Sequence, residues 1–63
     1  MIKFEWEYNN TGGASITHKG KLYTVLPSMS DGAFSAFQDD DMIGQYTTMS
    51  MAQDVCETVA VSN

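Results

Sequence analysis

Residues 14–27, which read ASITHKGKLYTVLP, decide the fold of this chain. The stretches 14–18 and 21–26 are rich in β-branched and aromatic side chains, which favour strands. Lys19-Gly20 lies between them, so the pattern predicts a β-hairpin that turns at the glycine.

The second strand of this hairpin is apolar on both faces. Its alternate residues form two sets, Leu22, Thr24 and Leu26 on one face and Tyr23 and Val25 on the other. Strands covered on both sides lie inside a sheet, so we place this strand at the centre. Pro27 should end it, because proline has no N–H to donate to a neighbouring strand.

Large apolar side chains alternate with charged ones at the N-terminal end of the chain. The apolar set is Ile2, Phe4, Trp6 and Tyr8, and its period of two predicts a strand over 2–8 with one buried face. The following NNTGG, residues 9–13, favours a turn because asparagine and glycine tolerate positive φ. We therefore expect a first hairpin here, and a core that includes Phe4, Trp6 and Leu22.

Two shorter strands are predicted after the central one. Residues 28–32 read as a loop and 33–37 as a fourth strand, for which one turn of helix is the alternative. Residues 42–46, MIGQY, are predicted to form a fifth strand at the edge of the sheet. Gly44 within it indicates a β-bulge.

The apolar pattern becomes helical near the C-terminus. Ala52, Val55, Cys56 and Val59 follow i, i+3, i+4, i+7 spacing, which predicts an amphipathic helix over about 49–60. Ser50 with Gln53 matches a capping box, and Thr48 is the alternative cap. The expected fold class is α+β: one 63-residue domain in which an antiparallel sheet of four to five short strands carries one C-terminal helix on one face.

Charge is distributed unevenly along the chain. The formal net charge is −5, all three lysines lie within residues 1–21, and residues 22–63 hold acidic side chains with no lysine or arginine. Nucleic acids and anionic membrane surfaces are bound through clustered basic residues, so we expect neither direct nucleic-acid binding nor membrane binding. Residues 1–5 also lack the apolar run of a signal peptide, and we expect a cytoplasmic protein, in the host cytoplasm if the chain is viral.

The sequence contains no recognisable catalytic or cofactor-binding constellation. Cys56 and His18 are the one cysteine and the one histidine, too few for a four-ligand zinc site. Cys56 falls in the apolar stripe, where a thiol is an inert small hydrophobe. The run Asp39-Asp40-Asp41 lacks the alternate ligand spacing of a calcium loop. We therefore expect a protein that is not an enzyme and that needs no metal or cofactor.

Acidic and methionine side chains instead point to a protein partner. Methionine is used at adaptable binding surfaces, and Met29, Met42, Met49 and Met51 are many for this length. We expect a small inhibitor or adaptor that docks on the basic, nucleic-acid-binding surface of a larger protein, such as a nucleic-acid-processing complex. The candidate partner-binding residues are the carboxylates Asp39, Asp40, Asp41, Asp54 and Glu57.

Size and charge also suggest an origin by analogy. Compact acidic proteins of this size are typical of viral counter-defence products, such as anti-CRISPR inhibitors or inhibitors of restriction nucleases. The alternative is a structural or regulatory homo-oligomer, such as a homodimer, in which the edges formed by residues 2–8 or 42–46 pair with a second copy.

Overall fold

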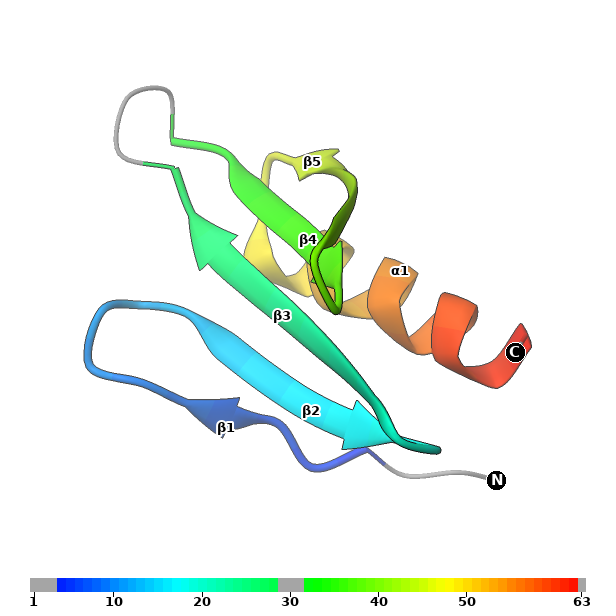
Figure 1. Cartoon of the computed structure of the whole chain (residues 1–63). Coiled ribbons are helices and arrows are strands. Elements are labelled where there is room, and N and C mark those ends of the chain that lie inside the picture. The colour runs from blue at the N-terminus through cyan, green and yellow to red at the C-terminus, as the bar shows by residue number, and fades with distance from the viewer. Residues whose placement is uncertain (1–3, 29–31, 63) are drawn as a thin grey trace.

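The computed structural model describes residues 4–28 and 32–62, and it is a five-stranded antiparallel sheet with one helix across one face (Figure 1). The strands are β1 (Glu7–Tyr8), β2 (Ala14–His18), β3 (Lys21–Pro27), β4 (Phe34–Gln38) and β5 (Asp41–Tyr46), and the helix is α1 (Met49–Ser62). They follow one another in the sheet in chain order. The predicted α+β class is confirmed.

β3 is the central strand, as its apolar pattern predicted. It pairs with β2 over the register Ala14↔Val25 to His18↔Lys21, and with β4 over Tyr23↔Gln38 to Pro27↔Phe34. The turn between β2 and β3 holds Lys19 and Gly20 at φ values of 53° and 78°. Two consecutive residues with positive φ are typical of the two-residue hairpin turn that suits the twist of the strands.

The β4–β5 hairpin carries the bulge predicted at Gly44. Phe37 pairs with Met42 while Ala36 pairs with Gly44, so Ile43 is the extra residue of β5. A Cβ atom on Gly44 would lie 2.7 Å from the Tyr46 hydroxyl oxygen, so any larger residue here would require the Tyr46 side chain to move. The fourth strand is confirmed as a strand rather than a helical turn, although it begins one residue later than predicted.

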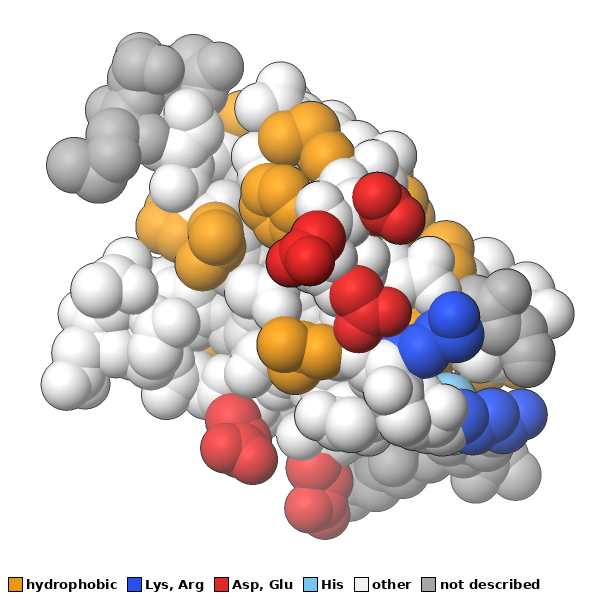
Figure 2. Space-filling view, viewed as in Figure 1, with side chains coloured by type: hydrophobic (Ala, Val, Ile, Leu, Met, Phe, Trp, Pro, Cys, Tyr) orange, Lys and Arg blue, Asp and Glu red, His pale blue; other side chains and the backbone are white. Residues whose placement is uncertain are grey.

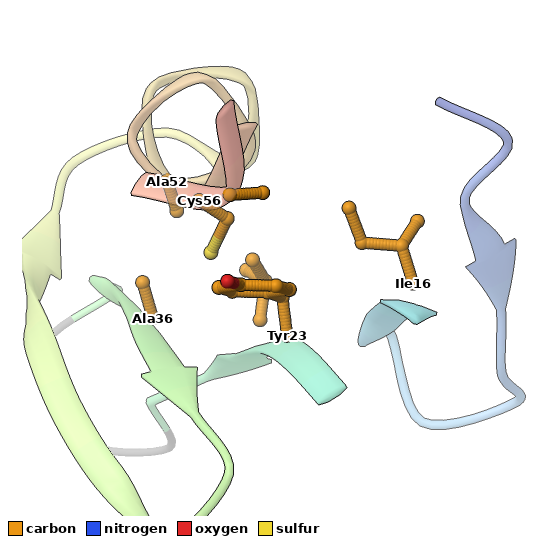
Figure 3. Packing of buried hydrophobic residues seen from close by; sticks show 7 residues of the cluster. Ile16, Tyr23, Ala36, Ala52 and Cys56 are labelled. Carbon is orange, nitrogen blue, oxygen red and sulfur yellow. The ribbon is translucent and has the colours of Figure 1, made fainter. Parts of the chain in front are cut away.

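The core lies between α1 and the inner face of the sheet (Figure 3). Its fully buried members include Tyr23 and Val25 of β3 and Cys56 of α1. Small side chains let the helix approach the sheet closely, since Ala52, Cys56 and Ala60 recur every fourth residue and are all buried. Of the predicted stripe, Val55 and Val59 lie half-buried at its margins, and Ala60 was missed.

The helix begins at Met49 and is capped by Thr48. The Thr48 hydroxyl oxygen accepts a hydrogen bond from the backbone N–H of Met51 at 3.1 Å, the geometry of an N-cap. The capping box predicted for Ser50 and Gln53 is therefore wrong, because Ser50 lies inside the helix and Gln53 donates to the Tyr8 hydroxyl at 3.2 Å. No helix among the described residues is long and apolar enough to cross a membrane.

Two sequence predictions about the core are corrected. The N-terminal strand is confined to Glu7–Tyr8, because Trp6 turns to α1, where its indole N–H donates to Glu57 at 2.8 Å. Phe4 and Trp6 pack only at the border of the core, Tyr8 is exposed, and Ile2 falls outside the described residues. Leu22 is 45% exposed rather than buried, since α1 covers the opposite face of β3.

Candidate functional site

The face of the sheet opposite α1 carries large apolar side chains that no other element covers among the described residues. Strand alternation and the register of the sheet place on it Leu22, Thr24 and Leu26 of β3, Phe37 of β4 and Met42 of β5, and we call this set the open face. Leu22, Leu26 and Met42 are 45%, 40% and 54% exposed. Of the four methionines named from the sequence, Met42 lies on this face and Met29 falls outside the described residues; Leu22, which was predicted to lie in the core, is also on this face.

Acidic side chains lie beside the apolar ones on the same side of the molecule. β4 passes in front of α1 in Figure 1, so the same view in Figure 2 looks onto the open face. Hydrophobic side chains are interspersed there with acidic ones, and basic side chains lie at one end. The β4–β5 turn supplies carboxylates at this position, since Asp39 and Asp40 line one surface depression together with Phe37.

A groove runs over the junction of β3 and β4. It is open to solvent, has a volume of about 240 Å³, and is lined by Thr24, Leu26, Phe37, Asp39 and Asp40. The pairing of Thr24 with Phe37 places these two side chains in its middle, and Leu26 lies one step further along β3. The groove is therefore apolar at one end and carries two carboxylates at the other.

Asp39 has a structural task within the turn. Its backbone N–H donates to the carbonyl oxygen of Leu22 at 2.7 Å, and its side-chain Oδ1 accepts the backbone N–H of Leu22 at 3.1 Å. Its φ of 54° lies in the left-handed region, which aspartate tolerates better than most residues. Asp39 thus fastens the β4–β5 turn to the start of β3 and keeps its second carboxylate oxygen outside these contacts.

Asp39, Asp40 and Asp41 are all exposed, but Asp40 and Asp41 lack a side-chain contact like the one between Asp39 and Leu22. Neither carboxylate makes a hydrogen bond or an ion pair within residues 4–28 and 32–62. Within the described part of the chain, their charge therefore faces solvent. We call Asp39, Asp40 and Asp41 the acidic turn.

The helix holds the other two predicted contact residues, away from the acidic turn. Asp54 is exposed on α1, and its backbone carbonyl accepts the Thr58 hydroxyl at 2.9 Å. Glu57 is half-buried and accepts the Trp6 indole N–H at 2.8 Å, which ties the N-terminal segment to the helix. The five predicted carboxylates thus separate into three at the β4–β5 turn and the start of β5, of which Asp39 and Asp40 line a groove on the open face, and two on α1.

The histidine and the cysteine have separate structural environments. The ring of His18 packs edge-on against Phe4 with centroids 5.2 Å apart, and its Nε2 is buried without a hydrogen-bond partner in the described part of the chain. Burial, followed by the negative charge of Glu57, raises the pKa of the Cys56 thiol to about 11. A thiol with that pKa is protonated at neutral pH and is a poor nucleophile. The described residues also contain no group of three or more His, Cys, Asp or Glu side chains arranged to hold a metal ion.

Comparison with known proteins gives no match for this chain, whether to a protein-family model, a curated protein or a solved structure. Its function has to be inferred from its own surface. We named Asp39, Asp40 and Asp41 from the sequence as candidate contact residues, which remains a prediction, but the sequence did not place Leu22, Leu26 and Phe37 on the surface. The available signal was the two-sided apolar pattern of β3, because one helix covers one face of a sheet and leaves the other open.

Proposed function

We propose that this chain is a protein-binding module that docks a larger protein on its open face and acidic turn. The observation that carries the proposal is the exposure of Leu22, Leu26 and Met42 on the face where Asp40 also lies, a carboxylate with no hydrogen-bond or ion-pair partner among the described residues. Protein interfaces combine apolar anchors with a polar rim, and clustered exposed apolar side chains on a small soluble protein are typical of such sites. Leu26 and Met42 would act as anchors, with Asp40 and Asp41 as part of the rim.

The charge of the module specifies a basic partner surface. Asp40 and Asp41 have no neutralising partner in the described chain, and the whole sequence carries a net −5. Complementary charge accelerates association and selects against acidic partners. Basic protein surfaces commonly serve to hold nucleic acid, so the module would act as an inhibitor or adaptor of a nucleic-acid-binding protein. A viral counter-defence role, against a CRISPR effector or a restriction nuclease, is the analogy that its size and charge support.

Homo-oligomerisation through a strand edge is the second candidate, since β5 is a six-residue strand at one edge of the sheet. Two features of β5 work against edge pairing. Its first residue is the charged Asp41, and the bulge at Ile43 interrupts the regular ladder. Charges and bulges are the devices by which natural edge strands avoid pairing with a second copy. We therefore favour a different protein as the partner.

Affinity capture with matched variants tests the proposal. The immobilised baits are the parent protein, an open-face variant, Leu26→Ser with Met42→Ser, and a helix variant, Met51→Ser with Val61→Ser. The helix variant is the control, because Met51 and Val61 are also exposed, at 48% and 55%, but lie on α1. From a lysate of the native host, a basic protein should be retained by the parent and the helix variant and lost from the open-face variant. Equal retention on all three baits would overturn the proposal.

Light scattering of the purified parent protein tests the oligomer hypothesis separately. A monomer agrees with the proposed role. A stable dimer that the open-face substitutions leave intact, and that a proline at Gln45 in β5 dissociates, would favour assembly through the strand edge instead.

A further inference from the structure

We propose that the groove between β3 and β4 receives an arginine side chain of the partner protein. This inference rests on the proposed function and specifies its chemistry. The groove has a volume of about 240 Å³ and lies within the open face, lined by Thr24, Leu26, Phe37, Asp39 and Asp40. Apolar side chains and carboxylates therefore lie next to each other within one small groove.

The apolar half of the groove suits the stem of a long basic side chain. Leu26 is 40% exposed and Phe37 half-buried, so both offer surface for methylene groups to pack against. Long basic side chains lay their aliphatic stems on apolar surface while their charged ends reach polar groups. The stem would lie over Leu26 and Thr24, and the charged end would point along β4 toward the turn.

The acidic half supplies acceptors for the charged end. Asp39 has one carboxylate oxygen engaged with the Leu22 N–H, which holds this side chain in place at the end of the groove. Asp40 also lines the groove, and its carboxylate has no partner among the described residues. Two adjacent carboxylates, one of them fixed by the fold, match a cation that can donate several hydrogen bonds at once.

Arginine fits this combination better than lysine. Its planar guanidinium donates five N–H groups in a fixed fork and is attracted to aromatic rings, and the groove offers carboxylates and the ring of Phe37. It is also more weakly hydrated than an ammonium group, so it loses less on entering a half-apolar site. A lysine carries the same charge, but its ammonium group is not planar and cannot match two carboxylates and an aromatic ring in the same way.

Titration of the isotope-labelled protein with blocked tripeptides, followed by amide NMR shifts, tests the inference without a known partner. The probes are Gly-Arg-Gly, Gly-Lys-Gly and Gly-citrulline-Gly, and citrulline keeps the shape of arginine without its charge. The arginine peptide should shift the amides of the groove residues Thr24, Leu26, Phe37, Asp39 and Asp40. The citrulline peptide should bind about fivefold more weakly than the arginine peptide, and the affinity of the lysine peptide should lie between these two.

Two carboxamide variants provide the matched control. Asp40→Asn should weaken the arginine peptide about threefold, whereas Asp54→Asn, which removes an exposed carboxylate from α1, should leave its affinity unchanged. Three results would overturn the inference. The amide shifts could be equally large at every Asp and Glu residue, the citrulline peptide could bind as tightly as the arginine peptide, or Asp40→Asn and Asp54→Asn could weaken the arginine peptide equally. If the arginine peptide fails while partner capture still depends on Leu26 and Met42, the groove assignment is wrong and the proposed function stands.

Discussion

Asp39 hydrogen-bonds both backbone groups of Leu22, accepting the N–H at 3.1 Å with Oδ1 and donating its own N–H to the carbonyl at 2.7 Å. The first side chain of the acidic turn therefore ties the turn to β3, whereas the Asp40 and Asp41 carboxylates make no hydrogen bond or ion pair among the described residues. This division decides which charges can be changed without disturbing the structure.

Substitutions in the acidic turn should separate these two roles. Asp39→Ala should lower the free energy of unfolding by about 2 kcal/mol, because it removes a hydrogen-bond acceptor and puts alanine at a φ of 54°. Asp39→Asn keeps a hydrogen-bond acceptor, and asparagine tolerates a positive φ, so this variant should lose less stability than Asp39→Ala. Asp40→Ala should change the free energy of unfolding by less than about 0.5 kcal/mol. Urea unfolding followed by circular dichroism measures all three. Equal losses for Asp39→Ala and Asp40→Ala would contradict the structural role of Asp39.

Val25 and Leu26 are adjacent in β3 but lie on opposite faces, 0% and 40% exposed. Val25→Ala should lower the free energy of unfolding by about 2 kcal/mol, because it opens a cavity beneath α1. Leu26→Ala should lower the free energy of unfolding by less than about 1 kcal/mol, since much of the Leu26 side chain is already in water. Thermal melts of the two variants give the comparison, and a larger loss for Leu26→Ala would mean that the open face is covered in the folded protein.

The hydrogen bond between the Trp6 indole and Glu57 should stabilise the packing of the N-terminal segment on α1. Trp6→Phe and Glu57→Ala, alone and combined, form a double-mutant cycle, because alanine leaves no acceptor for the indole N–H. We expect a coupling energy of about 1 kcal/mol, the usual size for a hydrogen bond to a charged, partly exposed group. Tryptophan fluorescence reports Glu57→Ala directly, because Trp6 is the one tryptophan. A coupling of zero would show that the two side chains do not interact in solution.

Cys56 should make stability depend on pH in the alkaline range. Its pKa is raised from 9.0 to about 11, chiefly by burial. The native state therefore holds the thiol proton more tightly than the unfolded state, and this contribution is complete below pH 9.0 and is lost as the pH rises toward 11. Across this range the parent should lose on the order of 2 kcal/mol more than Cys56→Ala, as measured by urea unfolding. Identical pH profiles for the two proteins would contradict burial of the thiol.

Much of the fold could be predicted because local patterns agree with it. The two-sided apolar pattern of 21–26 identified the central strand, Gly44 the bulge, and the spacing of Ala52 and Cys56 the helix. The N-terminal segment could not be predicted in this way. Its alternation resembled a strand, but a contact 51 residues away, from Trp6 to Glu57, turns the chain toward the helix. Tertiary contacts of this kind override a period-two pattern.

The site could be predicted only in part. Three consecutive aspartates are visible in the sequence, but the backbone contact that makes Asp39 structural joins residues 17 positions apart. Which face of β3 stays open depends on where α1 packs, and both faces carry apolar side chains. The exposure of Leu22 and Leu26 follows from that packing and not from their own neighbours in the chain.

The dissociation constant of the captured partner tests the central claim most directly, measured for the parent, the open-face variant Leu26→Ser with Met42→Ser, and the helix variant Met51→Ser with Val61→Ser. If the open face is the binding surface, the open-face variant should bind at least about tenfold more weakly, mainly through faster dissociation. The helix variant should stay within about twofold of the parent. A helix variant that loses binding while the open-face variant retains it would contradict the account and assign the interface to α1.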